Sequence, residues 1–95
     1  MNKKHHTKAE AKKLLTKYLE FNGLRKTPER FKILDEIYSD DGNFDIEALY
    51  ISMKSKHYRI ARASLYNTIK LLLDCRLIDE NKFGKNIKQF SKALK

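Results

Sequence analysis

The sequence predicts a mainly α-helical domain with a small β-hairpin, in the order of a winged helix: a helix-turn-helix followed by a two-stranded antiparallel wing. Three observations support this fold class. Apolar residues recur at three- and four-residue spacing in four successive segments, capping residues precede two of them, and two short strand patterns flank a glycine turn near the end. A chain of 95 residues is enough for one domain with a modest core.

The first predicted helix covers residues 7–22, and residues 1–6 before it are expected to form a disordered basic segment. Its apolar stripe is expected to be buried and consists of Leu14, Leu15, Tyr18 and Phe21. Asn22 and Gly23 end the helix, because glycine adopts the left-handed cap conformation at little cost.

The second predicted helix begins with Thr27 as N-cap, Pro28 at the first helical position and Glu29 in the first turn. Its expected buried stripe is Phe31, Leu34, Ile37 and Tyr38. Residues 39–43 are polar and form a loop by composition.

The third predicted helix starts at the capping residue Asp45 and is expected to bury Ile46, Leu49, Tyr50 and Met53. The fourth covers residues 61–75 and directs Leu65, Ile69 and Leu72 toward the core. Two strands are predicted at residues 77–82 and 86–90, joined by the turn 83–85, so the domain spans 7–92 and leaves 93–95 as a tail.

The fourth helix also has a second, cationic face. Arg59 lies just ahead of it, and the face itself carries Arg62, Ala63, Tyr66, Asn67 and Lys70. A helix in a DNA major groove needs cations for phosphate, polar groups for base edges and a small residue where the backbone comes close. The alternative interpretation is an ordinary solvated helix face.

The composition favours a polyanionic partner. The chain has 21 Lys+Arg against 12 Asp+Glu, a formal net charge of +9, so nucleic acid is the first expectation and an anionic membrane surface the second. No apolar run approaches the length of a membrane span, and the N-terminus lacks the apolar segment of a secretory signal. We therefore expect a cytoplasmic protein that does not bind to a membrane.

The sequence shows no arrangement typical of an enzyme. No glycine-rich phosphate loop and no nucleophile–histidine pairing is suggested, so neither catalysis nor a small-molecule substrate is expected. The single cysteine, Cys75, cannot form an internal disulfide, which fits a reducing compartment. A packed, inert thiol and a sensor or ligand both remain open for it.

Three motifs together resemble the DNA-binding half of the ferric uptake regulator (Fur) family. They are Gly-Leu-Arg-Lys-Thr-Pro-Glu-Arg at 23–30, Asn-Phe-Asp-Ile-Glu-Ala-Leu-Tyr at 43–50 and Ala-Ser-Leu-Tyr-Asn-Thr at 63–68, followed by Leu77-Ile78. The resemblance covers about residues 14–90.

The resemblance implies a bacterial, metal- or peroxide-responsive transcription factor, usually a repressor, that binds palindromic double-stranded operators as a homodimer. It places the recognition helix at residues 61–73, with Tyr66 on a tyrosine that contacts DNA and Ser64 and Asn67 beside it. It also places Arg30 toward the phosphate backbone, with Arg25 and Lys26 nearby.

The chain departs from the family at the positions expected to bind metal. Family members use zinc with iron or manganese, and a histidine and a glutamate commonly stand where this chain has Asn43 and Ser91. The dimerisation and metal-sensing domain of the family is also missing from the 95 residues. We therefore expect no metal cofactor in this chain, and a monomer in solution that pairs on DNA.

The wing is expected to contribute phosphate or minor-groove contacts. Lys82 precedes its turn and Lys85 lies in it, and both lysines also have an alternative role, because lysines protect sheet edges against aggregation. Within the recognition helix, Arg62 could pair with guanine. The function class that competes with operator binding is a winged-helix module for protein interaction or non-specific nucleic-acid binding.

Overall fold

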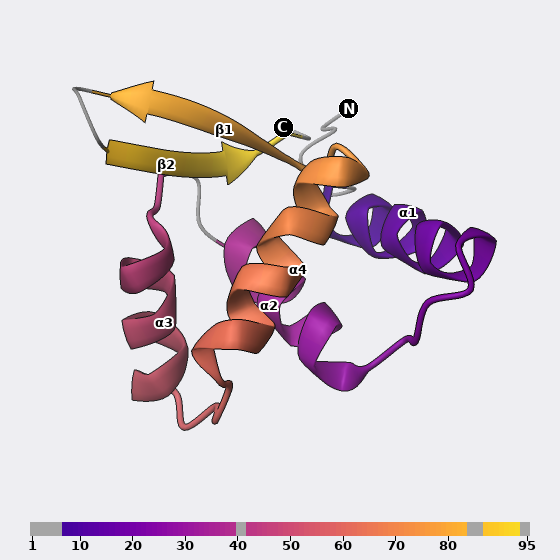
Figure 1. Ribbon diagram of the computed structural model, residues 1–95, viewed down its shortest axis with the longest axis horizontal. Helices are drawn as coiled ribbons and strands as arrows, with labels where there is room; N and C mark the ends of the chain where they lie inside the picture. The colour runs from indigo at the N-terminus through magenta and orange to yellow at the C-terminus, as the bar shows by residue number, and fades with distance from the viewer. Residues whose placement is uncertain (1–6, 40–41, 84–86, 94–95) are drawn as a thin grey trace.

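The computed structural model describes residues 7–39, 42–83 and 87–93, which form four helices and a two-stranded antiparallel sheet (Figure 1). The elements are α1 (Thr7–Phe21), α2 (Pro28–Tyr38), α3 (Ile46–Ser55), α4 (Arg62–Asp74), β1 (Ile78–Phe83) and β2 (Ile87–Lys92). This order confirms the predicted winged-helix fold. The predicted disordered segment 1–6, most of the predicted tail and the tip of the wing turn lie outside the described residues.

Helix α4 lies at the centre of the molecule. Figure 1 shows it crossing α2, with α3 on one side, α1 on the other and the hairpin over one end. One continuous core joins these elements, and its largest fully buried side chains are Leu15, Leu19, Ile33, Leu34, Met53, Leu65, Leu72, Leu77 and Ile78. Helix α4 contacts α2, α3 and β1, so this shared core sets its orientation.

The buried face of α1 differs from the predicted one. Ala11, Leu15 and Leu19 are fully buried, whereas Leu14 is 45% exposed and Phe21 is 90% exposed. The prediction for these last two residues was wrong, because a count of large apolar residues does not register alanine as a core residue. The small Ala11 side chain belongs to the contact face, and it rotates the buried stripe away from Leu14.

The capping interactions of α2 and α3 follow the predictions. The Thr27 hydroxyl accepts a hydrogen bond from the Arg30 amide at 3.4 Å, with Pro28 at the first helical position. The Asp45 carboxylate accepts from the Ala48 amide at 2.7 Å. These caps fix the start of each helix and therefore which residues turn inward.

The predicted buried stripes of α2, α3 and α4 are largely confirmed. All eleven residues expected in the core of these helices are buried or half-buried against it, and the half-buried ones are Phe31, Ile46 and Tyr50. Ile33 is fully buried and was missed by the prediction. It follows an i, i+4 spacing with Ile37, and α2 therefore has a wider apolar face than the stripe that begins at Phe31.

Three helices end with one residue in the left-handed conformation, and the next amide then donates to the carbonyl five residues earlier. These left-handed residues are Gly23, His57 and Arg76, with φ values of 66°, 68° and 64°. Of these three residues, only Gly23 was predicted from the sequence to adopt the left-handed conformation. A non-glycine residue in this conformation costs about 1–2 kcal/mol. At His57 and Arg76, backbone bonds and packing of the following residue offset that cost.

An isolated β-bridge pairs the loop before α3 with strand β2 of the hairpin. The register of the two strands runs from Ile78 opposite Lys92 to Phe83 opposite Ile87. Phe44 then pairs with Phe90: each amide donates to the other's carbonyl, at 2.8 and 2.7 Å, and the rings lie 5.8 Å apart. This bridge, which the sequence did not indicate, attaches the wing to the loop that begins α3.

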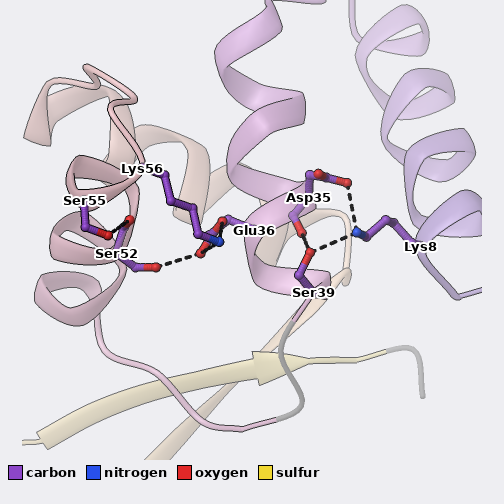
Figure 2. A network of polar contacts seen from close by, with 7 residues as sticks. All are labelled: Lys8, Asp35, Glu36, Ser39, Ser52, Ser55 and Lys56. Carbon is purple, nitrogen blue, oxygen red and sulfur yellow. Dashed lines mark hydrogen bonds and ion pairs between the residues drawn. The ribbon is translucent and has the colours of Figure 1, made fainter.

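Polar contacts join α2 to its neighbours on both sides (Figure 2). On one side, the Lys8 ammonium group contacts Asp35 at 3.3 Å and donates to the Ser39 hydroxyl at 2.9 Å. On the other side, Glu36 accepts from Ser52 at 2.7 Å and from Lys56 at 2.9 and 3.0 Å. The Glu36 side chain is only 14% exposed, so its contacts are the better shielded ones.

Replacing Glu36 with glutamine is expected to lower the free energy of unfolding at neutral pH by about 1–2 kcal/mol. Partial burial of the Glu36 carboxylate would raise its pKa, but the hydrogen bonds from Ser52 and Lys56 outweigh burial, and the pKa falls below the ordinary glutamate value. A depressed folded-state pKa stabilises the protein above the unfolded-state pKa, and this stabilisation disappears as pH falls through the folded-state value. Urea unfolding across the acid range measures it.

The difference between the wild type and the Glu36→Gln variant should therefore shrink as the pH falls below the ordinary glutamate range. The exposed Glu80 provides the control, since Glu80→Gln removes a carboxylate that is exposed on β1. A Glu36→Gln effect that stays constant at all pH values would contradict the charged hydrogen bonds.

Candidate nucleic-acid interface

Helix α4 has one buried and one exposed face, as the sequence predicted. Its buried residues are Leu65, Thr68, Ile69, Leu71 and Leu72. The opposite arc is exposed and carries Ala63, Tyr66, Asn67 and Lys70, with Tyr66 at 55% exposure. Ser64 is half-buried between the two faces. Because the buried face of α4 packs in the core, its exposed face is a rigid surface. This surface offers three hydrogen-bonding groups: a tyrosine hydroxyl, an amide and an ammonium group.

Arg62, the first residue of α4, is held by α3. Its guanidinium forms an ion pair with Glu47 and lies 4.2 Å from the ring centroid of Tyr50. The hydrogen bond from Arg62 to Glu47 raises the pKa of the guanidinium. The side chain remains 53% exposed, so it is available at the surface but oriented by two neighbours that sequence reasoning missed.

A cavity of about 650 Å³ lies where the chain leaves α3 and enters α4. It is lined by Tyr50, Lys54, His57, Tyr58, Arg59, Ile60 and Ala61. The N-terminus of α4 lies beside this cavity, and its N-cap residue Ala61 makes no side-chain hydrogen bond to the first backbone amides of the helix. Basic side chains beside an uncapped helix N-terminus suit an anion such as phosphate.

The cations around the start of α2 form a separate group. The Arg30 guanidinium donates to the Arg25 carbonyl at 2.6 Å, which folds the loop back onto the start of α2. Lys26 pairs with Glu20 at 2.6 Å, but both side chains are about half exposed, so the pair contributes little to stability. Arg25 and Lys26 are exposed and Arg30 is half-buried, so all three reach the surface.

The wing lysines are only partly placed by the structure. Lys82 lies on β1 opposite Lys88 in the register, and Lys88 is exposed. Lys85 lies outside the described residues, and its predicted contact stays a prediction.

The described residues contain no group of three or more histidine, cysteine, aspartate or glutamate side chains placed to hold a metal ion. Cys75 is half-buried at the end of α4, and its thiol lies 3.7 Å from the Leu72 carbonyl. Burial raises the pKa of the Cys75 thiol, which lowers the fraction present as reactive thiolate. This environment favours the packed thiol among the two roles considered for it.

Of the helices in the part of the chain that the structure describes, none is both long and apolar enough to cross a membrane.

The fold and this surface define a winged-helix domain whose central helix presents cationic and hydrogen-bonding side chains to solvent. Residues 21–95 match the ferric uptake regulator family, and the chain belongs to that family. The resemblance seen in the motifs is thereby confirmed.

A ferric uptake regulation protein is similar to this chain over most of the chain's length. The ferric uptake regulation protein of Campylobacter jejuni subsp. jejuni is 28% identical over 81 residues, which are 83% of this chain and 52% of the relative. The chain thus spans about half the length of that protein.

Two solved structures share the fold. The ferric uptake regulator of Helicobacter pylori, described as having three functional metal-binding sites, matches with a TM-score of 0.83 and 18% identity, over 93% of this chain and 59% of that one. PerR from Streptococcus pyogenes, described in terms of peroxide sensing and gene regulation, matches with a TM-score of 0.69 and 18% identity, over 81% and 53%. At such identity the similarity establishes the fold alone.

Proposed function

We propose that this chain binds double-stranded DNA sequence-specifically, as the DNA-binding part of a bacterial transcriptional regulator that acts as a repressor. The observation that carries the proposal is the exposed face of α4, where Tyr66, Asn67 and Lys70 project from a helix whose other face is locked in the core. Family membership supports the same function. A regulator of this kind works in the cytoplasm, where its operators are, and performs no catalysis.

In this proposal the N-terminal half of α4 enters the major groove. Asn67 has the donor and acceptor needed to pair with adenine, and the Tyr66 ring can contact a thymine methyl group while its hydroxyl reaches a phosphate. Arg62 exchanges its contact with Glu47 for guanine or phosphate. Because Glu47 and Arg62 are both about half exposed, this exchange requires no rearrangement of the core.

Phosphate contacts surround the groove-reading helix. The basic cavity at the start of α4, with Lys54 and Arg59, accepts one phosphate. The group formed by Arg25, Lys26 and Arg30 accepts the backbone on another side, and the wing lysines Lys82 and Lys85 a third segment. These contacts add affinity and register without reading sequence.

We propose that two copies bind a palindromic operator, each occupying one half-site. Relatives about twice as long contain additional chain that this sequence does not include. Pairing on DNA predicts half-sites whose centres are separated by about one helical turn, roughly 34–36 Å, or a multiple of it.

The proposal is tested by selecting bound duplexes from a random pool at physiological salt and then measuring the salt dependence of binding to the selected sequence. Sequence-specific binding predicts one enriched motif with two-fold symmetry, and an affinity at least about 10³ above that for random DNA. Affinity should also fall steeply as salt rises. Salt-dependent binding without enrichment would instead support a non-specific nucleic-acid module, and no duplex binding would support a protein-interaction module.

A further inference from the structure

The side chain of Asn81, in the middle of β1, joins the wing to the loop before α3. Its amide nitrogen donates to the Asn43 side-chain oxygen at 3.1 Å and to the Ser91 hydroxyl at 3.0 Å. Asn43 lies in the loop before α3, and Ser91 lies on β2 opposite Asp79. One amide on β1 therefore contacts two other segments, the loop before α3 and β2.

The same junction is reinforced by the neighbouring residues. Phe44 and Phe90, each adjacent to one of the acceptors, exchange two backbone hydrogen bonds and pack their rings together. The Asn81 bridge and the phenylalanine pair thus form one connection, which we call the wing clamp: Asn43, Phe44, Asn81, Phe90 and Ser91.

Positions 43 and 91 are those at which the family resemblance leads to a histidine and a glutamate that bind a regulatory metal. The residues present do not fit such a metal. Transition metals prefer imidazole, thiolate and carboxylate ligands, whereas Asn43 and Ser91 offer neutral oxygens. Both oxygens already accept a hydrogen bond from the Asn81 amide nitrogen.

We propose that the wing clamp fixes the wing against the loop before α3 without a metal, and that Asn81 is its positioning residue. The clamp keeps the wing in place for duplex binding whether or not transition metal is present. This inference rests on the proposed function for its effect on DNA, and on the free protein for its structural part.

The structural part is tested by hydrogen exchange of the free protein, followed by NMR at the Phe44 and Phe90 amides. Asn81→Ala removes both side-chain hydrogen bonds and should raise exchange at both amides about fivefold or more, while the α4 amides keep their protection. Ser91→Ala removes only one of the two bonds and should give a smaller increase. If Asn81→Ala destabilises the whole domain, Ser91→Ala tests the wing clamp in its place.

Asn22→Ala is the matched control. Asn22 also donates a side-chain hydrogen bond, to the Tyr18 carbonyl at 2.8 Å, but it is exposed and lies at the end of α1. It should leave Phe44 and Phe90 unchanged. Unchanged exchange at these amides in Asn81→Ala would overturn the clamp.

Metal independence is tested in the same experiment by comparing EDTA with equimolar ZnCl₂ or MnCl₂. Exchange at Phe44 and Phe90 in the wild type should be the same in all three conditions. Zinc- or manganese-dependent protection there, or metal-induced shifts of the Asn43 and Asn81 resonances, would overturn the proposal.

The functional part uses the selected duplex. Wild-type affinity should be equal in EDTA and in MnCl₂, and Asn81→Ala should reduce the salt slope by about 1–2, as expected when wing cations lose one or two phosphate contacts. Metal-dependent affinity or an unchanged slope would contradict the role of the clamp in DNA binding. Absence of duplex binding by the wild type would count against the proposed function, whereas the exchange measurement decides the clamp by itself.

Discussion

Replacing Tyr66 with alanine is expected to lower the preference for the operator over random duplex by about tenfold, within the range of roughly 1–3 kcal/mol for a base-reading contact. Tyr66 is 55% exposed on α4, and its neighbours on the buried face are unaffected by truncation. Alanine is also the better helix former, so the variant should stay folded. Fluorescence anisotropy with operator and scrambled duplexes measures the ratio of the two affinities.

Two further variants separate base reading from charge. Tyr66→Phe keeps the ring and removes the hydroxyl, so it should retain the part of the preference that comes from contact with a thymine methyl group. Lys70→Ala, one turn along the same exposed face, should weaken operator and scrambled duplexes about equally and lower the salt slope by about 1. Operator preference that survives Tyr66→Ala in full would show that α4 is not the reading helix.

Arg62 belongs to the same test but has a different expected result. Because its guanidinium contacts Glu47 and Tyr50 in the free protein, Arg62→Ala removes an interhelical contact as well as the proposed contact with DNA. Its effect on operator preference is therefore compared with that of Glu47→Gln, which removes the ion pair between the two helices but keeps the arginine. A loss of preference in Arg62→Ala alone would assign the arginine to DNA.

The elements of this fold could be predicted from local features of the sequence. Thr27, Pro28 and Asp45 act through hydrogen bonds and φ restraints within a few residues, so they can be recognised without knowledge of distant contacts. The core side of α4 was predictable for a similar reason, since Leu65, Ile69 and Leu72 repeat at helical spacing.

The parts that escaped prediction depend on segments far apart in the chain. The bridge between Phe44 and Phe90 is a pairing of one residue with one residue and has no alternating pattern. The contact of Arg62 with Glu47 depends on how α3 packs against α4, and two charged residues 15 positions apart do not indicate it. The exposed face of α4 could thus be predicted, but the neighbours that orient its first arginine could not.

Helix α1 offers the sharpest test of a corrected prediction, because two adjacent leucines that were both expected in the buried stripe differ in burial. Leu15→Ala is expected to lower the free energy of unfolding by about 2–5 kcal/mol, since Leu15 is fully buried and its truncation leaves a cavity in the core. Leu14→Ala should cost less than about 1 kcal/mol, because Leu14 is 45% exposed. Urea unfolding followed by circular dichroism measures both.

The pair is internally matched, which makes the comparison specific to burial. Both substitutions are Leu→Ala in the same turn of α1, so the change in helix propensity is the same and cancels in the difference. If the two variants lost equal stability, or if Leu14→Ala lost more, the stripe through Leu14, Tyr18 and Phe21 would be the packed one. The rotation of α1 that buries Ala11 would then be wrong. A difference of about 2 kcal/mol or more in favour of Leu15 as the buried residue would establish the observed face.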